Sequence, residues 1–340
     1  MIDAASDASR HERLIRWAAE CHALAPDAFE LRLAAGDASF RDYYRLTLPD
    51  GTTRILMDAP PDQEDSSPFV AIARRWEAAG LPVPHLYSVD LEAGFIELED
   101  LGNTPLQHCF DDAAETLTWH ERAMALLHDL QNHAGPGTLP RFDAALLERE
   151  LELFPEWCLG EWLGLETPVG WSALRQALVA QALTQPVVTV HRDFDAMNLM
   201  VRDDALVLID FQDAVAGPLN YDLVSLLRGR YCRFDAPRFA AWVEAFRCRA
   251  IADGRLPSRT TQADFLAQAN AMAAQRSLKV LGIFCRLTLR DRKPGYLERL
   301  PHFLDHLEDS LAGLEGHDAF KTWLSDTFRP ALVTRLEASA

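Results

Sequence analysis

The chain has 340 residues, of which 49% are hydrophobic and 25% are charged, and its formal net charge at pH 7 is −18. This composition is that of a globular protein with a packed core, and the length favours two lobes or domains over one. An acidic surface repels the phosphates of nucleic acids and anionic membranes, so we expect neither as a partner. No obligate protein partner is evident either.

Six cysteines are spread along the chain without a C-x-x-C pair or a tight Cys/His cluster, so we expect reduced thiols rather than a disulfide framework. The first residues are polar and charged, and no run of 18 apolar residues occurs. The sequence therefore predicts neither a signal peptide nor a membrane span, and favours a cytoplasmic protein.

The first hundred residues predict an antiparallel sheet with an internal helix. An amphipathic helix over 9–22 comes first, and Pro49-Asp50-Gly51 forms a hairpin turn. A second helix begins at Ser67-Pro68, where a capping residue precedes a proline, and ends at Gly80. The expected strands are 30–33, 43–48, 54–57, 85–89 and 95–99.

After Gly102 the pattern becomes mostly helical, with helices expected at 111–133, 142–163, 171–184, 237–253, 262–291, 297–312 and 318–338. One β segment interrupts them: 187–190 leads into a loop, then 199–201 and 206–211 pair across a turn at 202–205. The predicted fold class is thus α+β and bilobal. A small β-rich lobe is expected over 1–100 and a larger helical lobe over 101–340.

The stretch that carries chemistry lies between residues 187 and 214. His191-Arg192-Asp193 is followed after four residues by Asn198, which is the H-R-D-x-x-x-x-N spacing of kinase catalytic loops. Asp210 follows twelve residues later, at the end of an apolar segment. A chance tripeptide in a buried loop is the alternative, but the joint match of loop, asparagine, hairpin and final aspartate argues against it.

Phosphoryl transfer explains this set of residue types. The attacking hydroxyl must be held in line with the γ-phosphate, and the phosphate charge must be neutralised, mostly by Mg²⁺. Asp193 can orient the hydroxyl and accept its proton. Asn198 and Asp210 offer an amide oxygen and a carboxylate, both suited to Mg²⁺. His191 is expected to brace the loop.

These residues resemble the catalytic core of the aminoglycoside phosphotransferase and choline kinase superfamily, in which Asp-Phe-Gln, here 210–212, often stands in place of Asp-Phe-Gly. The following segment, 217–228, is similar to the family's next segment, where an aspartate, here Asp222, opens a helix. The resemblance implies a protein-kinase-like fold with ATP and Mg²⁺ as cofactors. It also implies that the lobe over 1–100 binds the nucleotide and that the lobe over 101–340 carries the catalytic loop and the substrate site. We interpret Asp222 as a helix cap.

Segments 36–46, 57–73, 210–228 and 279–301 look more closely like the bacterial amino-sugar kinases of cell-wall recycling. That resemblance implies phosphorylation of the anomeric 1-hydroxyl of N-acetylmuramate and N-acetylglucosamine, in peptidoglycan recycling.

On the nucleotide side the sequence departs from the kinase pattern. The turn expected over the phosphates, Gly36-Asp37-Ala38-Ser39, has one glycine, and no lysine precedes Lys279. Without a third-strand lysine, either Arg41, Arg45 or Arg54 supplies the positive charge or Mg²⁺ carries more of it. Glu64 and Asp65 are left without an obvious lysine partner. The adenine is expected against backbone groups of a segment that includes Glu97, Glu99 and Leu101.

Three further residues are candidates for the acceptor sugar. Asp213 follows Asp210 by three residues, although a solvated loop carboxylate is an equally good interpretation. Arg276, Lys279, Arg286 and Arg290 recur with helical periodicity, and Arg286 and Arg290 could bind an anion such as a muramyl carboxylate. Salt bridges to the acidic remainder of the chain are the simpler explanation.

Two other functions stay open at this stage. One is a kinase of the same fold for another small alcohol, such as an aminoglycoside, choline or homoserine, since fold does not determine substrate. The other is a nucleotide-binding pseudokinase, which the absent lysine suggests.

Overall fold

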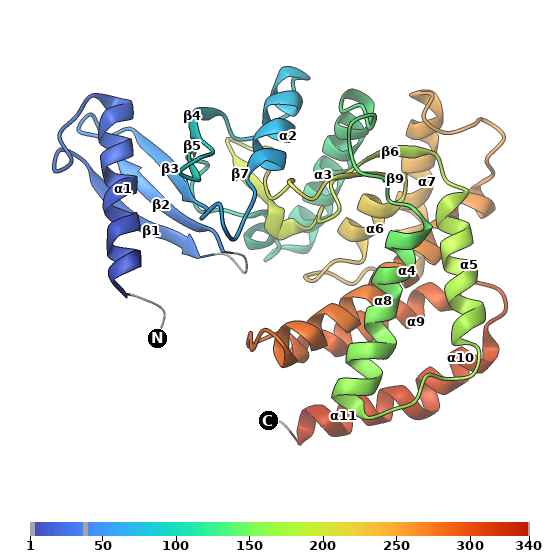
Figure 1. Ribbon diagram of the computed structural model, residues 1–340. Helices are drawn as coiled ribbons and strands as arrows, with labels where there is room; N and C mark the ends of the chain where they lie inside the picture. Colours follow the sequence, from blue (N-terminus) through green and yellow to red (C-terminus); the bar gives the residue numbers. More distant parts are fainter. Residues whose placement is uncertain (1–3, 37–39, 339–340) are drawn as a thin grey trace. The chain divides into compact units, whose positions relative to one another are not determined.

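The computed structural model describes residues 4–36 and 40–338. The chain divides into two compact units, residues 1–105 with 199–213 and residues 106–198 with 214–340. The first unit contains a five-stranded sheet and the second is mostly helical (Figure 1). The predicted α+β class is thereby confirmed. The grouping of 199–213 with the first unit was not predicted from the sequence.

The sheet of the first unit has the strand order β1-β2-β3-β5-β4, and every neighbouring pair is antiparallel. Gly51 has a φ of 84° in the turn between β2 and β3, a conformation in which glycine has no side-chain clash. The strands are β1 (Glu30–Gly36), β2 (Asp42–Thr47), β3 (Thr53–Asp58), β4 (Leu86–Asp90) and β5 (Phe95–Glu99).

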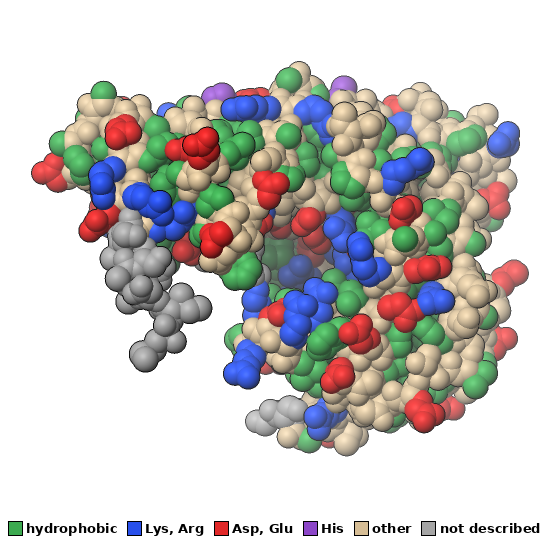
Figure 2. Space-filling view, in the orientation of Figure 1, with side chains coloured by type: hydrophobic (Ala, Val, Ile, Leu, Met, Phe, Trp, Pro, Cys, Tyr) green, Lys and Arg blue, Asp and Glu red, His purple; other side chains and the backbone are tan. Residues whose placement is uncertain are grey.

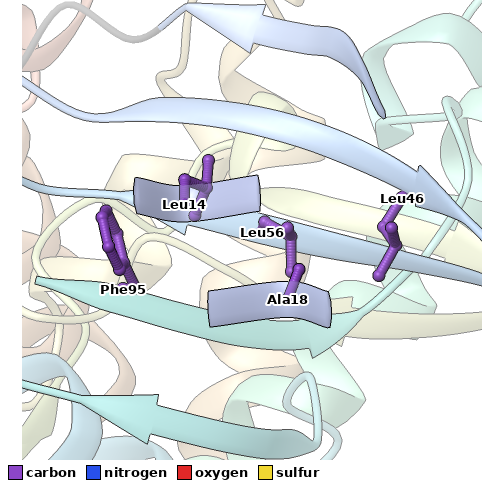
Figure 3. Packing of buried hydrophobic residues seen from close by; sticks show 5 residues of the cluster. All are labelled: Leu14, Ala18, Leu46, Leu56 and Phe95. Atoms are coloured by element: carbon purple, nitrogen blue, oxygen red, sulfur yellow. The ribbon is translucent and has the colours of Figure 1, made fainter. Parts of the chain in front are cut away.

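Helix α1 (Ala4–His22) covers one face of this sheet (Figure 1). Leu14 and Ala18, one helical turn apart, point toward Leu46, Leu56 and Phe95 on three strands (Figure 3). All five side chains are buried. The apolar side of the predicted helix therefore forms one half of a core whose other half is the alternating apolar side of the strands.

A two-stranded hairpin of β7 (Leu199–Arg202) and β8 (Ala205–Leu208) belongs to the same unit. Its turn residues Asp203 and Asp204 both have positive φ, 48° and 62°, as expected of a tight two-residue hairpin. Backbone hydrogen bonds from Val201 to Thr104 and from Leu208 to Pro82 fix the hairpin to the rest of the unit. The residues that follow β8 are thereby held in place.

The second unit is built around the long helix α8 (Gln262–Leu289) (Figure 1). The N-terminus of α8 is capped by Thr261, whose hydroxyl accepts from the backbone N–H of Asp264. The other helices are α3 (Ala113–His133), α4 (Ala144–Leu153), α5 (Trp171–Leu183), α6 (Tyr221–Leu227), α7 (Ala236–Ala252), α9 (Leu300–Ala312), α10 (Asp318–Trp323) and α11 (Arg329–Glu337).

The structure differs from the sequence prediction in several details, including the division of the predicted helix 318–338 into α10, a π-helical segment Leu324–Phe328 and α11. The predicted helix 142–163 is α-helical only to Leu153 and continues as a π-helical segment, Phe154–Leu163, because Pro155 cannot supply a backbone N–H. The predicted strand 206–211 ends at Leu208. Strand β6 (Val187–Val190) pairs with β9 (Val215–Pro218), a strand that was not predicted.

Acidic side chains are scattered among basic ones on the face shown in Figure 2, so the net charge is not gathered there into one patch. Among residues 4–36 and 40–338, no helix is both long and apolar enough to cross a bilayer.

Candidate active site

The predicted catalytic loop joins β6 to a short 3₁₀ turn, Ala196–Asn198, within the second unit. His191 is fully buried at the end of β6, and its ring meets that of Phe194 edge to face. Arg192 has a φ of 80°, a left-handed conformation that is strained for a residue with a side chain. Asp193 follows directly, so the position of the predicted base depends on this strained residue being held.

Asp222 holds the loop from α6. Its two carboxylate oxygens accept hydrogen bonds from the backbone N–H groups of His191, at 2.6 Å, and Arg192, at 3.0 Å. Burial raises the pKa of Asp222 to about 7, against the opposing effect of these two hydrogen bonds. The interpretation of Asp222 as a helix cap is wrong, because Asn220 is the capping position of α6 and the carboxylate is used by the catalytic loop.

Asp193 is half-buried and surrounded by cations. Burial alone would raise its pKa, but Lys279, Arg276, His191 and Arg192 outweigh that effect, and the pKa lies below the ordinary value. Asp193 is therefore an ionised carboxylate at neutral pH, able to accept a hydrogen bond from a hydroxyl group.

Asn198 is buried, and its amide nitrogen donates to the backbone oxygen of Asp193 at 2.9 Å. That bond occupies the donor side of the amide and leaves the amide oxygen as the atom suited to a metal ion. The donor chemistry of Asn198 thus fits a Mg²⁺ ligand.

Asp210 lies in the first unit, after the end of β8, and has a φ of 60°. One of its carboxylate oxygens accepts from the side-chain amide of Gln212 at 2.8 Å. The next residue, Phe211, is fully buried: its ring stacks on Phe69 with centroids 5.0 Å apart and lies 5.3 Å from Trp76. Helix α2 (Ser67–Ala78) therefore anchors the Asp-Phe segment and fixes the backbone that carries Asp210.

Arg41 and Glu64 form an ion pair in the first unit that was not predicted from the sequence. Arg41 is 3% exposed. Burial would lower its pKa, but Tyr43 and Glu64 raise it above the ordinary value. Glu64 precedes α2, so the pair joins a cation beside the predicted phosphate turn to the helix region, as the lysine–glutamate pair does in kinases.

The other two arginines considered for that role have different partners. Arg45 binds the carboxylate of Asp100 through two nitrogens, at 2.7 and 3.0 Å. Arg54 lies over the ring of Tyr87, 4.0 Å from its centroid, and 3.9 Å from Glu97. Arg41 is thus the one of the three that pairs with Glu64.

The remaining predicted nucleotide residues are spread over the sheet. Gly36 ends β1, opposite Asp42 of β2, whereas Asp37, Ala38 and Ser39 lie outside the described residues. Glu97 lies in β5 between β3 and β4, and its buried carboxylate contacts His22 at 2.9 Å. The carboxylate of Glu99 contacts Arg202 of β7. Leu101 lies two residues after Glu99, the last paired residue of β5, so its backbone lies beyond the sheet register.

The predicted basic stripe of α8 divides into two parts. Arg276 and Lys279 are buried and act on Asp193. Arg286 is half-buried, and Arg290 is exposed and binds its neighbour Asp291 at 2.7 and 3.0 Å. Asp213, the other candidate for the acceptor, is exposed in the first unit.

Sequence reasoning missed a cluster under the catalytic loop. The buried carboxylate of Glu150, on α4, contacts Arg192 at 2.9 Å and Lys279 at 3.5 Å, and accepts from Gln275 at 3.2 Å. Lys279 also donates to the hydroxyl of Tyr221 at 3.1 Å. The one available signal was a glutamate among apolar residues at 147 and 151 of an amphipathic helix, which marks a buried charge in need of a partner.

Asp195 was missed as well. It is buried within the catalytic loop and binds Arg230 at 3.1 Å, with Arg276 4.0 Å away. The H-R-D-x-x-x-x-N pattern leaves this position open, so the motif gave no reason to single it out.

Two bacterial relatives are similar over most of their length. An N-acetylmuramate/N-acetylglucosamine kinase of Pseudomonas aeruginosa is 39% identical over 323 residues, which cover 90% of this chain and 94% of the relative. A protein of the same name from Neisseria meningitidis is 38% identical over 288 residues, covering 82% and 85%.

Solved structures share the fold at low sequence identity. An ADP-bound aminoglycoside phosphotransferase has a TM-score of 0.56 at 13% identity, covering 89% of this chain and 97% of its own. An amicoumacin kinase in complex with AMP-PNP and Ca²⁺ has a TM-score of 0.59 at 14% identity, covering 91% and 96%. The model of the "Phosphotransferase enzyme family" matches residues 30–258, a range that contains the catalytic loop and Asp210. The chain therefore belongs to the phosphotransferase enzyme family, as its catalytic motif predicts.

Proposed function

We propose that the protein is an ATP- and Mg²⁺-dependent kinase that phosphorylates the 1-hydroxyl of N-acetylmuramate and N-acetylglucosamine. The observation that carries this proposal is the 39% identity to a kinase named for these two sugars, over 94% of that relative's length. The ionised Asp193 in a complete H-R-D-x-x-x-x-N loop supports it. The product would enter peptidoglycan recycling, and we expect the reaction in the cytoplasm, where ATP is available.

Asp193 is the residue that meets the acceptor in this proposal. Its carboxylate accepts the hydrogen bond of the anomeric hydroxyl and takes its proton as the sugar oxygen attacks the γ-phosphorus. The bond from that phosphorus to the β-phosphate oxygen breaks, and the products are the sugar 1-phosphate and ADP. Positioning of the hydroxyl matters as much as proton transfer, because phosphoryl transfer needs little covalent help from the protein.

Asn198 and Asp210 are proposed as the metal ligands, through an amide oxygen and a carboxylate. When bound, Mg²⁺ neutralises charge on the phosphates. Arg41, supported by Glu64, is proposed to contact the phosphates, together with backbone N–H groups of the turn 36–39. Backbone groups near Glu97, Glu99 and Leu101 are proposed to face the adenine, with Leu101 favoured because it lies beyond the sheet register.

The test is a panel of acceptors with Mg-ATP: N-acetylmuramate, N-acetylglucosamine, kanamycin, choline and homoserine. ADP release is followed, and the product is identified by phosphorus NMR. We expect a sugar 1-phosphate with the two amino sugars and, in Asp193→Asn, a fall in kcat of roughly 10²- to 10⁴-fold.

If kanamycin, choline or homoserine were phosphorylated in place of the sugars, the proposed substrate would be wrong and the proposed mechanism would stand. Bound ATP with no turnover of any acceptor would favour the pseudokinase interpretation.

The same panel tests the acceptor residues. We propose that Arg286 and Arg290 interact with the carboxylate that N-acetylmuramate has and N-acetylglucosamine lacks, and that Asp213 faces the acceptor. Arg286→Glu should then raise KM for N-acetylmuramate and leave KM for N-acetylglucosamine unchanged. An equal change in KM for the two sugars would show that the arginines do not have this role.

A further inference from the structure

Arg192 is held in its left-handed conformation by two hydrogen bonds, one from its backbone and one from its side chain. The backbone N–H donates to Asp222 at 3.0 Å, and the side chain donates to Glu150 at 2.9 Å. Asp222 lies on α6 and Glu150 on α4, so two separate helices act on the one residue that precedes Asp193. A φ of 80° is disfavoured for any residue with a Cβ and persists only where the surroundings impose it.

The carboxylate of Glu150 is buried in the second unit and is held there by two residues of α8. It is 4% exposed, and Gln275 and Lys279 of α8 lie 3.2 and 3.5 Å from its carboxylate oxygens. These two contacts fix the carboxylate independently of Arg192. Glu150 therefore stays paired when Arg192 is replaced, and such a replacement does not leave a buried charge without a partner.

We propose that Glu150 is a positioning residue for phosphoryl transfer: its ion pair with Arg192 maintains the left-handed conformation of that residue and so fixes the carboxylate of Asp193. The inference rests on the proposed function only in naming Asp193 as the residue that meets the acceptor hydroxyl. Glu150 itself contacts no reacting atom in this proposal. Its effect should fall on kcat, because it acts on the geometry of Asp193 and not on nucleotide binding.

The decisive comparison is between Arg192→Ala and Arg192→Gly. Both variants remove the ion pair with Glu150, but only glycine adopts a φ of 80° without strain. We expect Arg192→Ala to lower kcat by roughly tenfold or more, and Arg192→Gly to recover most of that loss. KM for ATP should stay within about twofold of the wild type in both. Equal kcat values for the two variants would overturn the proposal.

A second comparison tests Glu150 directly. Glu150→Gln keeps the shape of the side chain and removes the charge. It should lower kcat by roughly tenfold in the wild-type chain, and by no more than about threefold in the Arg192→Gly chain, where no strain needs to be held. An equal loss in both backgrounds would show that Glu150 acts by a route other than Arg192.

Arg292 offers a matched control, because it also has a positive φ, 55°, but is exposed after the end of α8. Arg292→Gly and Arg292→Ala should leave kcat unchanged. Unfolding midpoints of all variants show whether a lower kcat comes from a displaced Asp193 or from a smaller fraction of folded protein. The kcat ratios are measured with whichever acceptor the wild type phosphorylates, or with water as acceptor in ATP hydrolysis. A wrong substrate assignment therefore leaves the test of Glu150 intact.

Discussion

At the scale of single residues, His191 and Arg192 are held by carboxylates outside the motif, whereas Asn198 is held by a residue of the motif itself. His191 and Arg192 depend on Asp222, Arg192 also depends on Glu150, and Asn198 donates to the backbone of Asp193. Arg41 has such a partner too, in Glu64. The chemistry is thus carried by a few residue types at fixed spacing, and their conformations are set by buried charges that the spacing does not show.

The Arg41–Glu64 pair leads to a prediction about nucleotide affinity. Glu64→Gln should raise KM for ATP by roughly 3- to 10-fold and leave kcat nearly unchanged, because a charge-assisted bond that orients Arg41 is weakened. Initial rates against ATP concentration measure it.

Asp65→Asn is the matched control for that experiment. Asp65 is the adjacent acid, is exposed, and accepts from the backbone N–H of Ser67 at 2.9 Å. Its variant should leave KM for ATP unchanged. Equal effects at the two positions would mean that Glu64 has no special role in nucleotide binding.

At the scale of elements, α8 connects the catalytic loop to the rest of the second unit. Gln275 and Lys279 contact Glu150 of α4, and Lys279 contacts Tyr221 of α6. Seven residues after Gln275, Gly282 lies against the backbone at the end of α4. A Cβ at Gly282 would come within 2.3 Å of the carbonyl carbon of Leu153. The close approach of these helices therefore requires glycine at this position.

Gly282→Ala should lower the free energy of unfolding by about 1–3 kcal/mol, since backbone cannot move aside as a flexible side chain does. Denaturant unfolding measures the change. Gly135→Ala is the control, because a Cβ there meets nothing within 4 Å, and it should change the free energy by no more than about 0.5 kcal/mol. Equal stability of the two variants would contradict the tight contact between α8 and Leu153.

At the scale of the whole molecule, buried histidines make stability depend on pH. Burial, with His302 and Arg228 nearby, lowers the pKa of His306 to about 3, and burial with Arg255 lowers the pKa of His128 to about 4. Both are neutral in the folded protein at pH 5, whereas the unfolded chain, with a histidine pKa of about 6.5, binds protons there. Since the unfolded state binds more protons, stability falls as the pH falls below about 6.5.

When the pH is lowered from 7 to 5, each of these histidines should reduce the free energy of unfolding by about 2 kcal/mol. His306→Gln keeps a donor for the backbone oxygen of Gly229, which lies 3.1 Å from Nε2, and removes the titration. Its stability should therefore fall less steeply over this range than that of the wild type, as followed by denaturant unfolding at several pH values. Parallel pH profiles for the two proteins would contradict the low pKa of His306.

The sequence by itself determined the family, the α+β class, most element positions and the motif residues. These follow from local signals: alternation in strands, helical periodicity, and the fixed spacing of a loop whose residues are near neighbours in the chain. Even the turns could be predicted, since Gly51 and Asp203-Asp204 specify their own backbone conformations.

Only the tertiary structure decided which charges meet. Arg41 and Glu64 are 23 positions apart, Arg192 and Asp222 are 30 apart, and Arg192 and Glu150 are 42 apart. No pattern of hydrophobicity or spacing specifies such pairs, because many acids and bases in a chain of net charge −18 could serve equally well. The same reason explains why Asp222 was taken for a helix cap, because an aspartate near the start of a helix acquires its role only from the residues that contact it. It also explains why β9 was missed, because its four small or apolar residues form a strand only through their pairing with another strand.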